Sequence, residues 1–106
     1  MINNFLEMVR IPSESGDENE FLQYLEGKLR YDIGAVCCFD PYSNLIARLP
    51  GKNTIQTKPV LFELHADTVK PGKEIQPVIQ DDIISSSGNT ILGTDDKAGI
   101  AEVLEV

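Results

Sequence analysis

The run Val60–Leu64 is apolar at all but one of its positions and leads directly into His65, the only histidine of the 106-residue chain. A run that is apolar on both faces is typical of a strand covered by helices on both sides of a parallel or mixed sheet. Ligands bind in the crevice beyond the carboxyl ends of such strands. We therefore expect an α/β fold in which His65 lies at the end of a buried strand, where binding sites form.

Helical spacing of apolar residues predicts three helices. Pro12 ends the first of them near Arg10, and Asp17 with Glu20 three residues later reads as a capping box that opens the second. Asp95 or Asp96 stands where the third helix would have its N-cap. The expected helices cover approximately residues 3–10, 17–30 and 97–104.

Two β-hairpins are predicted between these helices. Runs of β-favouring residues flank clusters of turn residues at 40–44 and at Asp81-Asp82. A further turn over residues 50–53 closes the first hairpin. The expected strands are residues 35–39 with 45–49, and residues 75–79 with 83–86.

The net charge of the chain limits the kinds of molecule that it is expected to bind. Seventeen acidic residues against nine basic ones give a net charge of −8, so the field of the protein repels phosphate backbones and anionic lipid surfaces. We expect no nucleic-acid or membrane partner. Acidity alone names no substrate, because many proteins are acidic for solubility.

The amino terminus and the cysteines both predict a cytoplasmic protein. Residues 1–7 lack a basic segment followed by an apolar one, and no stretch of about 18 apolar residues occurs. Cys37 and Cys38 are adjacent, so on a strand their side chains point to opposite faces and a disulfide between them is geometrically poor. We expect both thiols to be reduced, as in the cytosol.

His65 and Asp67 lie two residues apart and so share one face of an extended segment. A zinc site takes the neutral imidazole as a ligand, and a nearby carboxylate can fix the tautomer and orientation of that ring. The simpler alternative is a partly buried histidine bonded to a neighbouring carboxylate without any metal.

Asp95 and Asp96 form the second candidate cluster, at the mouth of a helix between Gly93 and Gly99. The helix dipole and the free backbone N–H groups favour carboxylates at this position. Plain N-capping requires only one acid, whereas a carboxylate can also bridge two metal ions in two-metal hydrolysis. Adjacent acids can therefore divide these tasks, one binding metal while the other fixes the turn.

The segment His65–Val69 followed by Leu92–Ala101 resembles the co-catalytic zinc exopeptidases that include tripeptidase T, carboxypeptidase G and the aminoacylases. The resemblance is strongest to peptidase T and its Gram-positive relatives. It extends to Phe5–Ser13 and so covers essentially the whole chain. It implies that residues 1–106 are the N-terminal portion of a zinc-exopeptidase catalytic domain, with a mixed sheet flanked by helices.

The resemblance also implies a role for each site residue. The histidine matching His65 binds one zinc ion, and the aspartate matching Asp95 bridges both. The one matching Asp67 is catalytic and orients or tunes the histidine. Asp96 matches the residue after the bridging ligand, where the family often has a cis peptide bond. The implied cofactor is a pair of zinc ions, with cobalt or manganese as alternatives.

The activity implied is that of an aminotripeptidase-like metallopeptidase, in which a zinc-activated water hydrolyses N-terminal residues from short peptides. The family's site also needs a Glu-Glu pair that includes the general base, another acidic ligand and a second histidine. None of these follows, because the chain ends in the helix after Asp96. We therefore expect a truncated chain without a second domain that is inactive alone; formation of a homo-oligomer is left open.

The alternative belongs to a different class of protein. A small non-catalytic α/β module, whose acids bind a cation or a partner for structural reasons, would explain the missing ligands without truncation.

Overall fold

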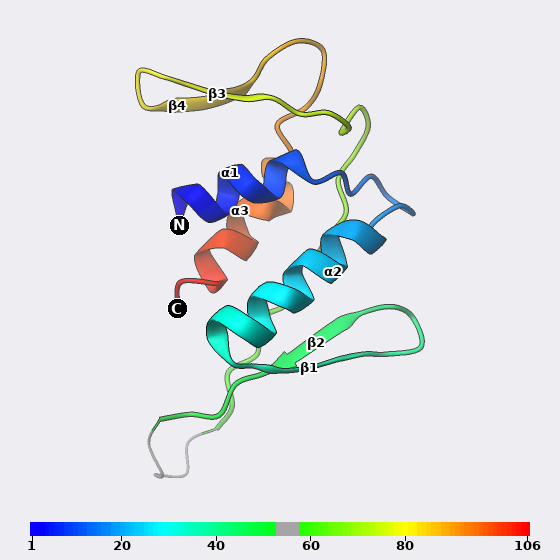
Figure 1. Cartoon of the computed structure of the whole chain (residues 1–106), viewed down its shortest axis with the longest axis vertical. Helices are drawn as coiled ribbons and strands as arrows, with labels where there is room; N and C mark the ends of the chain where they lie inside the picture. Colours follow the sequence, from blue (N-terminus) through cyan, green and yellow to red (C-terminus); the bar gives the residue numbers. More distant parts are fainter. Residues whose placement is uncertain (53–57) are drawn as a thin grey trace.

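The computed structural model describes residues 1–52 and 58–106, and the described part is a mixed α/β domain, as predicted (Figure 1). Asn53, the last residue of the turn predicted over 50–53, lies outside the described residues. Each sheet has two antiparallel strands. The elements are α1 (Ile2–Arg10), α2 (Asn19–Gly27), the π-helix η1 (Lys28–Ile33), β1 (Val36–Phe39), β2 (Leu45–Arg48), β3 (Pro77–Gln80), β4 (Ile83–Ser86) and α3 (Thr94–Val103).

The three α-helices build the core. In Figure 1, α1 lies against α3, the β3–β4 hairpin lies on one side of this pair, and α2 with the β1–β2 hairpin lies on the other. The helices enclose a cluster of buried apolar side chains. Burial of each large apolar side chain contributes about 1.5–3 kcal/mol relative to exposure, so this cluster makes the main contribution to the stability of the fold. Its members are Phe5, Met8, Val9, Phe21, Leu25, Ile75, Ile100 and Ala101.

Both predicted hairpins are confirmed, and local turn chemistry explains them. The Asp40 carboxylate accepts hydrogen bonds from the backbone N–H groups of Tyr42 and Asn44, each at 2.8 Å. Asp81 and Asp82 have φ angles of 50° and 63°, as two-residue hairpin turns of type I′ require. Each turn therefore sets the register of the strands that it joins.

The second helix begins later than predicted, because Asp17 does not cap it. The α2 helix starts at Asn19, and no side chain caps its first turn. The Asp17 carboxylate instead accepts a hydrogen bond from Lys73 Nζ at 2.8 Å. This ion pair ties the loop after α1 to the loop after Thr68, so a contact distant in sequence replaces the predicted local one.

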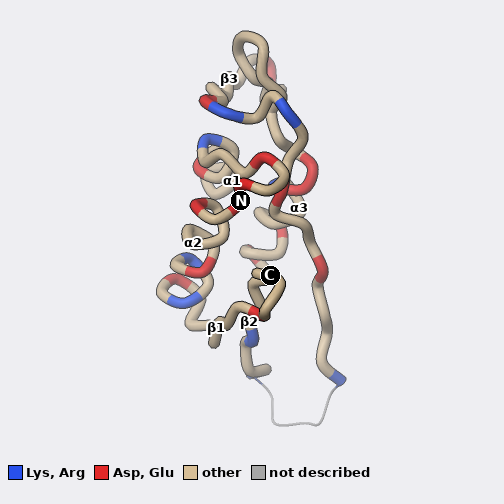
Figure 2. Tube along the Cα trace, turned by 90° about the vertical axis from the view of Figure 1, so that its right-hand side faces the viewer, with Lys and Arg blue, Asp and Glu red and all other residues tan. Residues whose placement is uncertain are grey.

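The segment Val60–Leu64 is not the buried strand that its composition predicts. Within the described part of the chain it has no strand partner, and Val60 and Leu61 are 78% and 86% exposed. It runs as an extended connection, visible in Figure 2 as the long stretch that carries a single acidic residue. No strand among the described residues lies beside this segment, so no sheet covers its apolar side chains.

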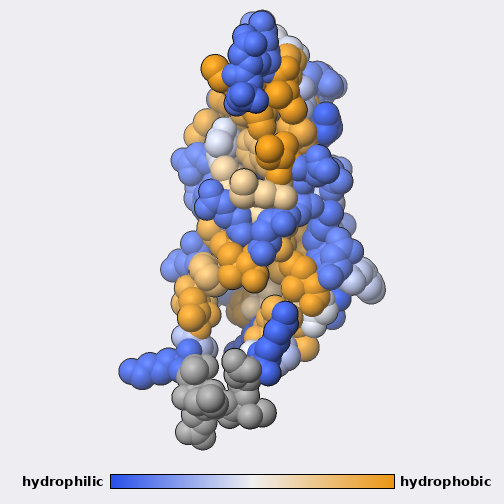
Figure 3. Space-filling model, turned by 90° about the vertical axis from the view of Figure 1, so that its left-hand side faces the viewer, coloured by the Kyte–Doolittle hydropathy of each residue, from blue (hydrophilic) through white to orange (hydrophobic). Residues whose placement is uncertain are grey.

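Apolar side chains also reach the surface on the side of the molecule where the two termini lie (Figure 3). A groove of about 270 Å³ opens there between α1 and α3, and Phe5, Leu92, Ala98 and Ala101 line it. No described helix is both long enough and apolar enough to cross a membrane.

Lys97, in α3, is the most deeply buried charged residue, with 1% of its surface exposed. Its Nζ donates hydrogen bonds to the carbonyl oxygens of Met8 at 3.0 Å and Ile11 at 2.6 Å, where α1 ends. It also lies 4.4 Å from the centre of the Phe21 ring. Burial lowers the pKa of Lys97 to about 8. The ammonium group thus donates to the Ile11 carbonyl and gives the Met8 carbonyl, which also accepts the Ile11 N–H, a second donor. These bonds fasten α3 to the end of α1.

We expect Lys97→Met to lower the free energy of unfolding by about 1–3 kcal/mol, because the Ile11 carbonyl loses its donor and the Met8 carbonyl loses one of two donors. Urea denaturation followed by circular dichroism measures this loss. Lys73→Met is the matched control: its partner Asp17 is exposed, so the change should be about 1 kcal/mol or less. A Lys97→Met chain as stable as the unmodified chain would contradict the role assigned to this ammonium group.

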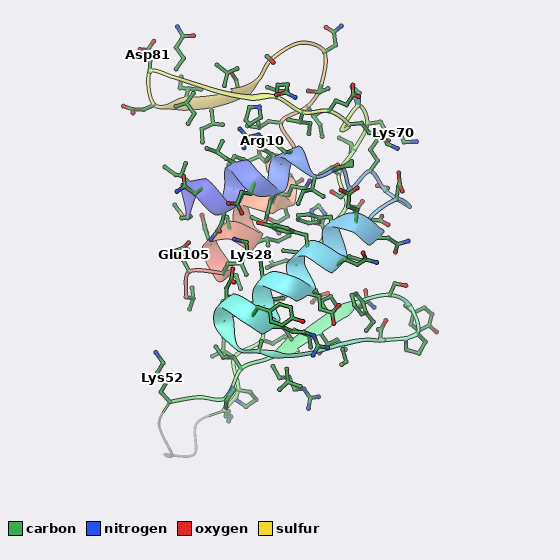
Figure 4. The ribbon with its side chains drawn as sticks, in the orientation of Figure 1. Arg10, Lys28, Lys52, Lys70, Asp81 and Glu105 are labelled. Carbon is green, nitrogen blue, oxygen red and sulfur yellow. The ribbon has the colours of Figure 1, made fainter. Side chains whose placement is uncertain are left out.

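A second polar network joins α1 to α2. The Tyr24 hydroxyl donates to Glu7 Oε2 at 2.8 Å, and Lys28 Nζ lies 3.1 Å from the same oxygen. Lys28, the first residue of η1, therefore reaches Glu7 of α1 from the end of α2 (Figure 4). Burial, followed by the bond to Glu7, raises the pKa of Tyr24 from 10.0 to about 12.

This shift predicts a pH dependence of stability. A pKa that is higher in the folded chain means that the folded state holds the phenolic proton more tightly than the unfolded state. The stabilising contribution is therefore complete below pH 10.0 and is lost as the pH rises toward about 12. Urea denaturation across this range should show a steeper decline for the unmodified chain than for Tyr24→Phe. Equal slopes would contradict the assignment.

Candidate metal centre

Three of the residues singled out by the sequence meet at one point of the structure. His65 Nε2 lies 3.0 Å from Oδ1 of Asp95, which comes from the start of α3, 30 positions along the chain. On the other side of the ring, His65 Nδ1 lies 3.0 Å from the backbone oxygen of Asp67 and 3.2 Å from its Oδ1. The imidazole is thus held between two carboxylates.

The electrostatics of this cluster follow from its hydrogen bonds. The Asp95 carboxylate raises the pKa of His65, and Asp67 adds to this effect while burial opposes it. The pKa of Asp67 is lowered, first by the hydroxyl of Ser15, which donates to Oδ2 at 2.6 Å, and then by His65. A chain of polar contacts of 2.6–3.2 Å therefore runs from Ser15 through Asp67 and His65 to Asp95, and both ring contacts are hydrogen bonds when both ring nitrogens carry protons.

Asp96 does a different task from Asp95. Both residues have non-helical backbone angles, and the regular part of α3 begins only after them. Asp96 Oδ1 accepts a hydrogen bond from the backbone N–H of Gly99 at 3.2 Å, as an N-cap residue does. The peptide bond between Asp95 and Asp96 is cis, the conformation expected from the resemblance. Of the two acids, Asp96 caps the helix while Asp95 faces the histidine.

The atoms beside the imidazole are suited to binding a metal ion. Two zinc ligands at bond lengths of about 2.0–2.2 Å lie roughly 3.3 Å apart in a tetrahedral site, close to the 3.0 Å that separates His65 Nε2 from Asp95 Oδ1. The two side chains are 49% and 95% exposed, so an ion can reach them. Nδ1 contacts Asp67, so Nε2 is the ring nitrogen that a metal ion could use.

These two residues fill only part of a coordination shell. Within residues 1–52 and 58–106, no group of three or more histidine, cysteine, aspartate or glutamate residues is placed to hold a metal ion. The cysteines do not add to the cluster: Cys37 is buried, Cys38 is exposed, and both are free. The donor set therefore fits zinc in kind, while its number falls short of the four ligands of a typical site.

Sequence reasoning missed Ser15 and Glu14 as parts of this region. Ser15 is separated from Asp67 by 52 positions, and Glu14 accepts a hydrogen bond from the backbone N–H of Gly72 across 58 positions. No local spacing rule joins such distant residues. The only signal in the sequence is their place directly after the segment Phe5–Ser13, which takes part in the family resemblance.

No family model matches the chain. The crystal structure of aminopeptidase PepT from Bacillus cereus ATCC 10987 superposes with a TM-score of 0.92 and 38% identity, over 98% of this chain and 30% of that one. The chain has the fold of the N-terminal part of PepT.

The chain is also similar to two further proteins. A tripeptidase from Staphylococcus aureus subsp. aureus Mu50 gives a TM-score of 0.89 at 36% identity, again over 98% of this chain and 30% of that one. The uncharacterized protein YqjE of Bacillus subtilis (strain 168) is 38% identical over 99% of this chain and 30% of its own length. The chain thus spans about 30% of the length of these relatives.

Gly99 and Gly27 give a matched pair of tests for the capped start of α3. A Cβ at Gly99 would collide with the Asp96 carboxylate, and its contact with Asp96 Cγ would be 3.0 Å, whereas a Cβ at Gly27 meets nothing within 4 Å. We expect Gly99→Ala to destabilise the chain by about 1–2 kcal/mol through loss of the cap, and Gly27→Ala to stabilise it by up to about 1 kcal/mol. Urea denaturation measures both, and a neutral Gly99→Ala would contradict the capping role of Asp96.

Proposed function

We propose that the chain is the N-terminal part of a di-zinc metallo-exopeptidase of the aminotripeptidase type, which removes N-terminal residues from short peptides. The single observation that carries the proposal is the placement of His65 Nε2 beside Asp95 Oδ1, with Nδ1 held by Asp67. The likeness to an aminopeptidase and a tripeptidase supports the reaction class. The motif around these residues supports the use of two metal ions.

Each residue of the cluster has a distinct task in this proposal. His65 Nε2 and the Asp95 carboxylate would hold zinc. Asp67 keeps the imidazole proton on Nδ1 and fixes the ring plane. Asp96 caps the regular part of α3, and the Asp95 carboxylate lies beside His65. When bound, zinc supplies a Lewis acid for the peptide carbonyl and lowers the pKa of a bound water.

The remaining parts of the proposal concern the whole protein. The general base, the other ligands and a second domain would lie in the part of the relatives that this chain does not span. The substrate would be a short peptide, the compartment the cytoplasm, and cobalt or manganese could replace zinc. The net charge of −8 accords with a partner that is neither nucleic acid nor an anionic membrane.

A non-catalytic cation- or partner-binding module is the second candidate. One observation favours it: the described residues bring no third histidine, cysteine or carboxylate ligand to the pair. In that case His65 and Asp95 would form an ion pair with a purely structural role.

Calorimetric zinc titration separates these candidates. We expect weak zinc binding by the unmodified chain and a loss of affinity on the order of tenfold or more in His65→Ala and in Asp95→Ala, because each removes a ligand. Asp81→Asn, in the β3–β4 turn outside the cluster (Figure 4), removes a charge without removing a ligand and should bind like the unmodified chain. Unchanged affinity in both ligand variants would favour the module.

Peptide hydrolysis gives a separate test. The 106-residue chain should release no amino acid from tripeptides in the presence of zinc, because its described residues offer the site only two ligands. Robust hydrolysis by the purified chain would contradict the proposal that the base and further ligands come from outside it.

A further inference from the structure

Both oxygens of the Asp67 carboxylate are engaged by side chains. Oδ2 accepts the hydroxyl hydrogen of Ser15 at 2.6 Å, and Oδ1 lies 3.2 Å from His65 Nδ1. A carboxylate held at both oxygens cannot turn about its Cβ–Cγ bond without breaking one of the two contacts. Ser15 therefore helps to determine which atom the imidazole meets.

The backbone around Ser15 is fixed to the segment that carries Asp67. Glu14 and Thr68 form a parallel bridge, in which Ser15 N–H donates to Thr68 O at 3.1 Å and Thr68 N–H donates to Ser13 O at 2.8 Å. These bonds place the Ser15 hydroxyl beside Asp67, so its bond to Oδ2 is not a chance contact of a free loop.

The Glu14 side chain also joins the loop after α1 to the segment that follows Asp67. Its buried Oε1 accepts a hydrogen bond from the backbone N–H of Gly72 at 2.9 Å. The packing there is close: a Cβ at Gly72 would lie 3.0 Å from Thr68 Oγ1 and 3.4 Å from Glu14 Cγ. The loop after α1 thus holds the segment that follows His65 in place through backbone and side-chain hydrogen bonds.

We propose that Ser15 is a positioning residue of the metal centre, which holds the Asp67 carboxylate so that His65 keeps its proton on Nδ1 and presents Nε2 beside Asp95. The role in metal binding rests on the function proposed above. The role in orienting the imidazole rests on the contacts alone.

Loss of the hydroxyl has a specific chemical consequence. The Asp67 side chain is 43% exposed, so without Ser15 its carboxylate can turn toward water. Nδ1 then keeps only the backbone oxygen of Asp67 at 3.0 Å, while Asp95 still attracts a proton to Nε2. A neutral ring with its proton on Nε2 has no lone pair there and cannot bind a metal through that atom.

The test compares Ser15→Ala with two matched variants. Ser13→Ala removes a hydroxyl from the same loop, but that hydroxyl is buried and has no hydrogen-bond partner, so it controls for changes in the loop itself. Ser15→Thr retains the donor at an exposed position and should restore the behaviour of the unmodified chain. Ser15→Cys, which keeps the size but weakens the donor, replaces Ser15→Ala if the latter does not fold.

Two readouts are needed. In the metal-free chain, nitrogen-15 NMR of the neutral imidazole reports the tautomer, and we expect Ser15→Ala to raise the fraction protonated at Nε2 by about twofold or more. Zinc titration should show a dissociation constant raised on the order of tenfold. Ser13→Ala should change neither quantity.

The outcomes separate this inference from the proposed function. An unchanged tautomer in Ser15→Ala, or an equal change in Ser13→Ala, would overturn the positioning role even if zinc binds. A tautomer shift in Ser15→Ala that Ser15→Thr reverses would support it. If the unmodified chain bound no zinc while the tautomer shifted, the proposed function would fail and the orienting role of Ser15 would stand.

Discussion

The buried ammonium of Lys97 is the contact on which the candidate centre depends. It holds the start of α3 against the carbonyls of Met8 and Ile11, where α1 ends. Asp95 lies two residues before Lys97, so the position of this carboxylate is set by the same attachment. The chain then continues from Ile11 into the loop that carries Ser15. One buried charge thus aligns the segment that supplies Asp95 with the segment that supports Asp67 and His65.

Asp95 and Asp96 are adjacent in sequence but have different roles. Asp96 is used by the helix, because its side chain accepts the N–H of Gly99 that an unmade first turn leaves free. Asp95 is thereby released to face His65 at 3.0 Å. The non-helical angles of both residues allow this separation of directions. A regular helix beginning at Asp95 would not place the two carboxylates in this way.

In the relatives, the segment that matches this chain is part of a longer chain. The chain aligns with about 30% of the length of PepT and of the Staphylococcus tripeptidase. Val60 and Leu61 are strongly exposed, and an apolar groove opens between α1 and α3. The sequence pattern of Val60–Leu64 is that of a strand with neighbours, and within the described part of the chain it has none.

Local chemistry by itself determined much of the fold and half of the site. Pro12 ends α1, the Asp81-Asp82 pair makes a hairpin turn, and the alternation of an extended segment brings Asp67 to His65. Each of these acts over a few residues, within reach of sequence rules.

Only the tertiary structure decided that Ser15 binds Asp67, that Asp17 pairs with Lys73 instead of capping α2, and that Lys97 reaches α1 across 89 positions. These bonds join segments whose approach depends on the packing of the whole core, and no local propensity carries that information.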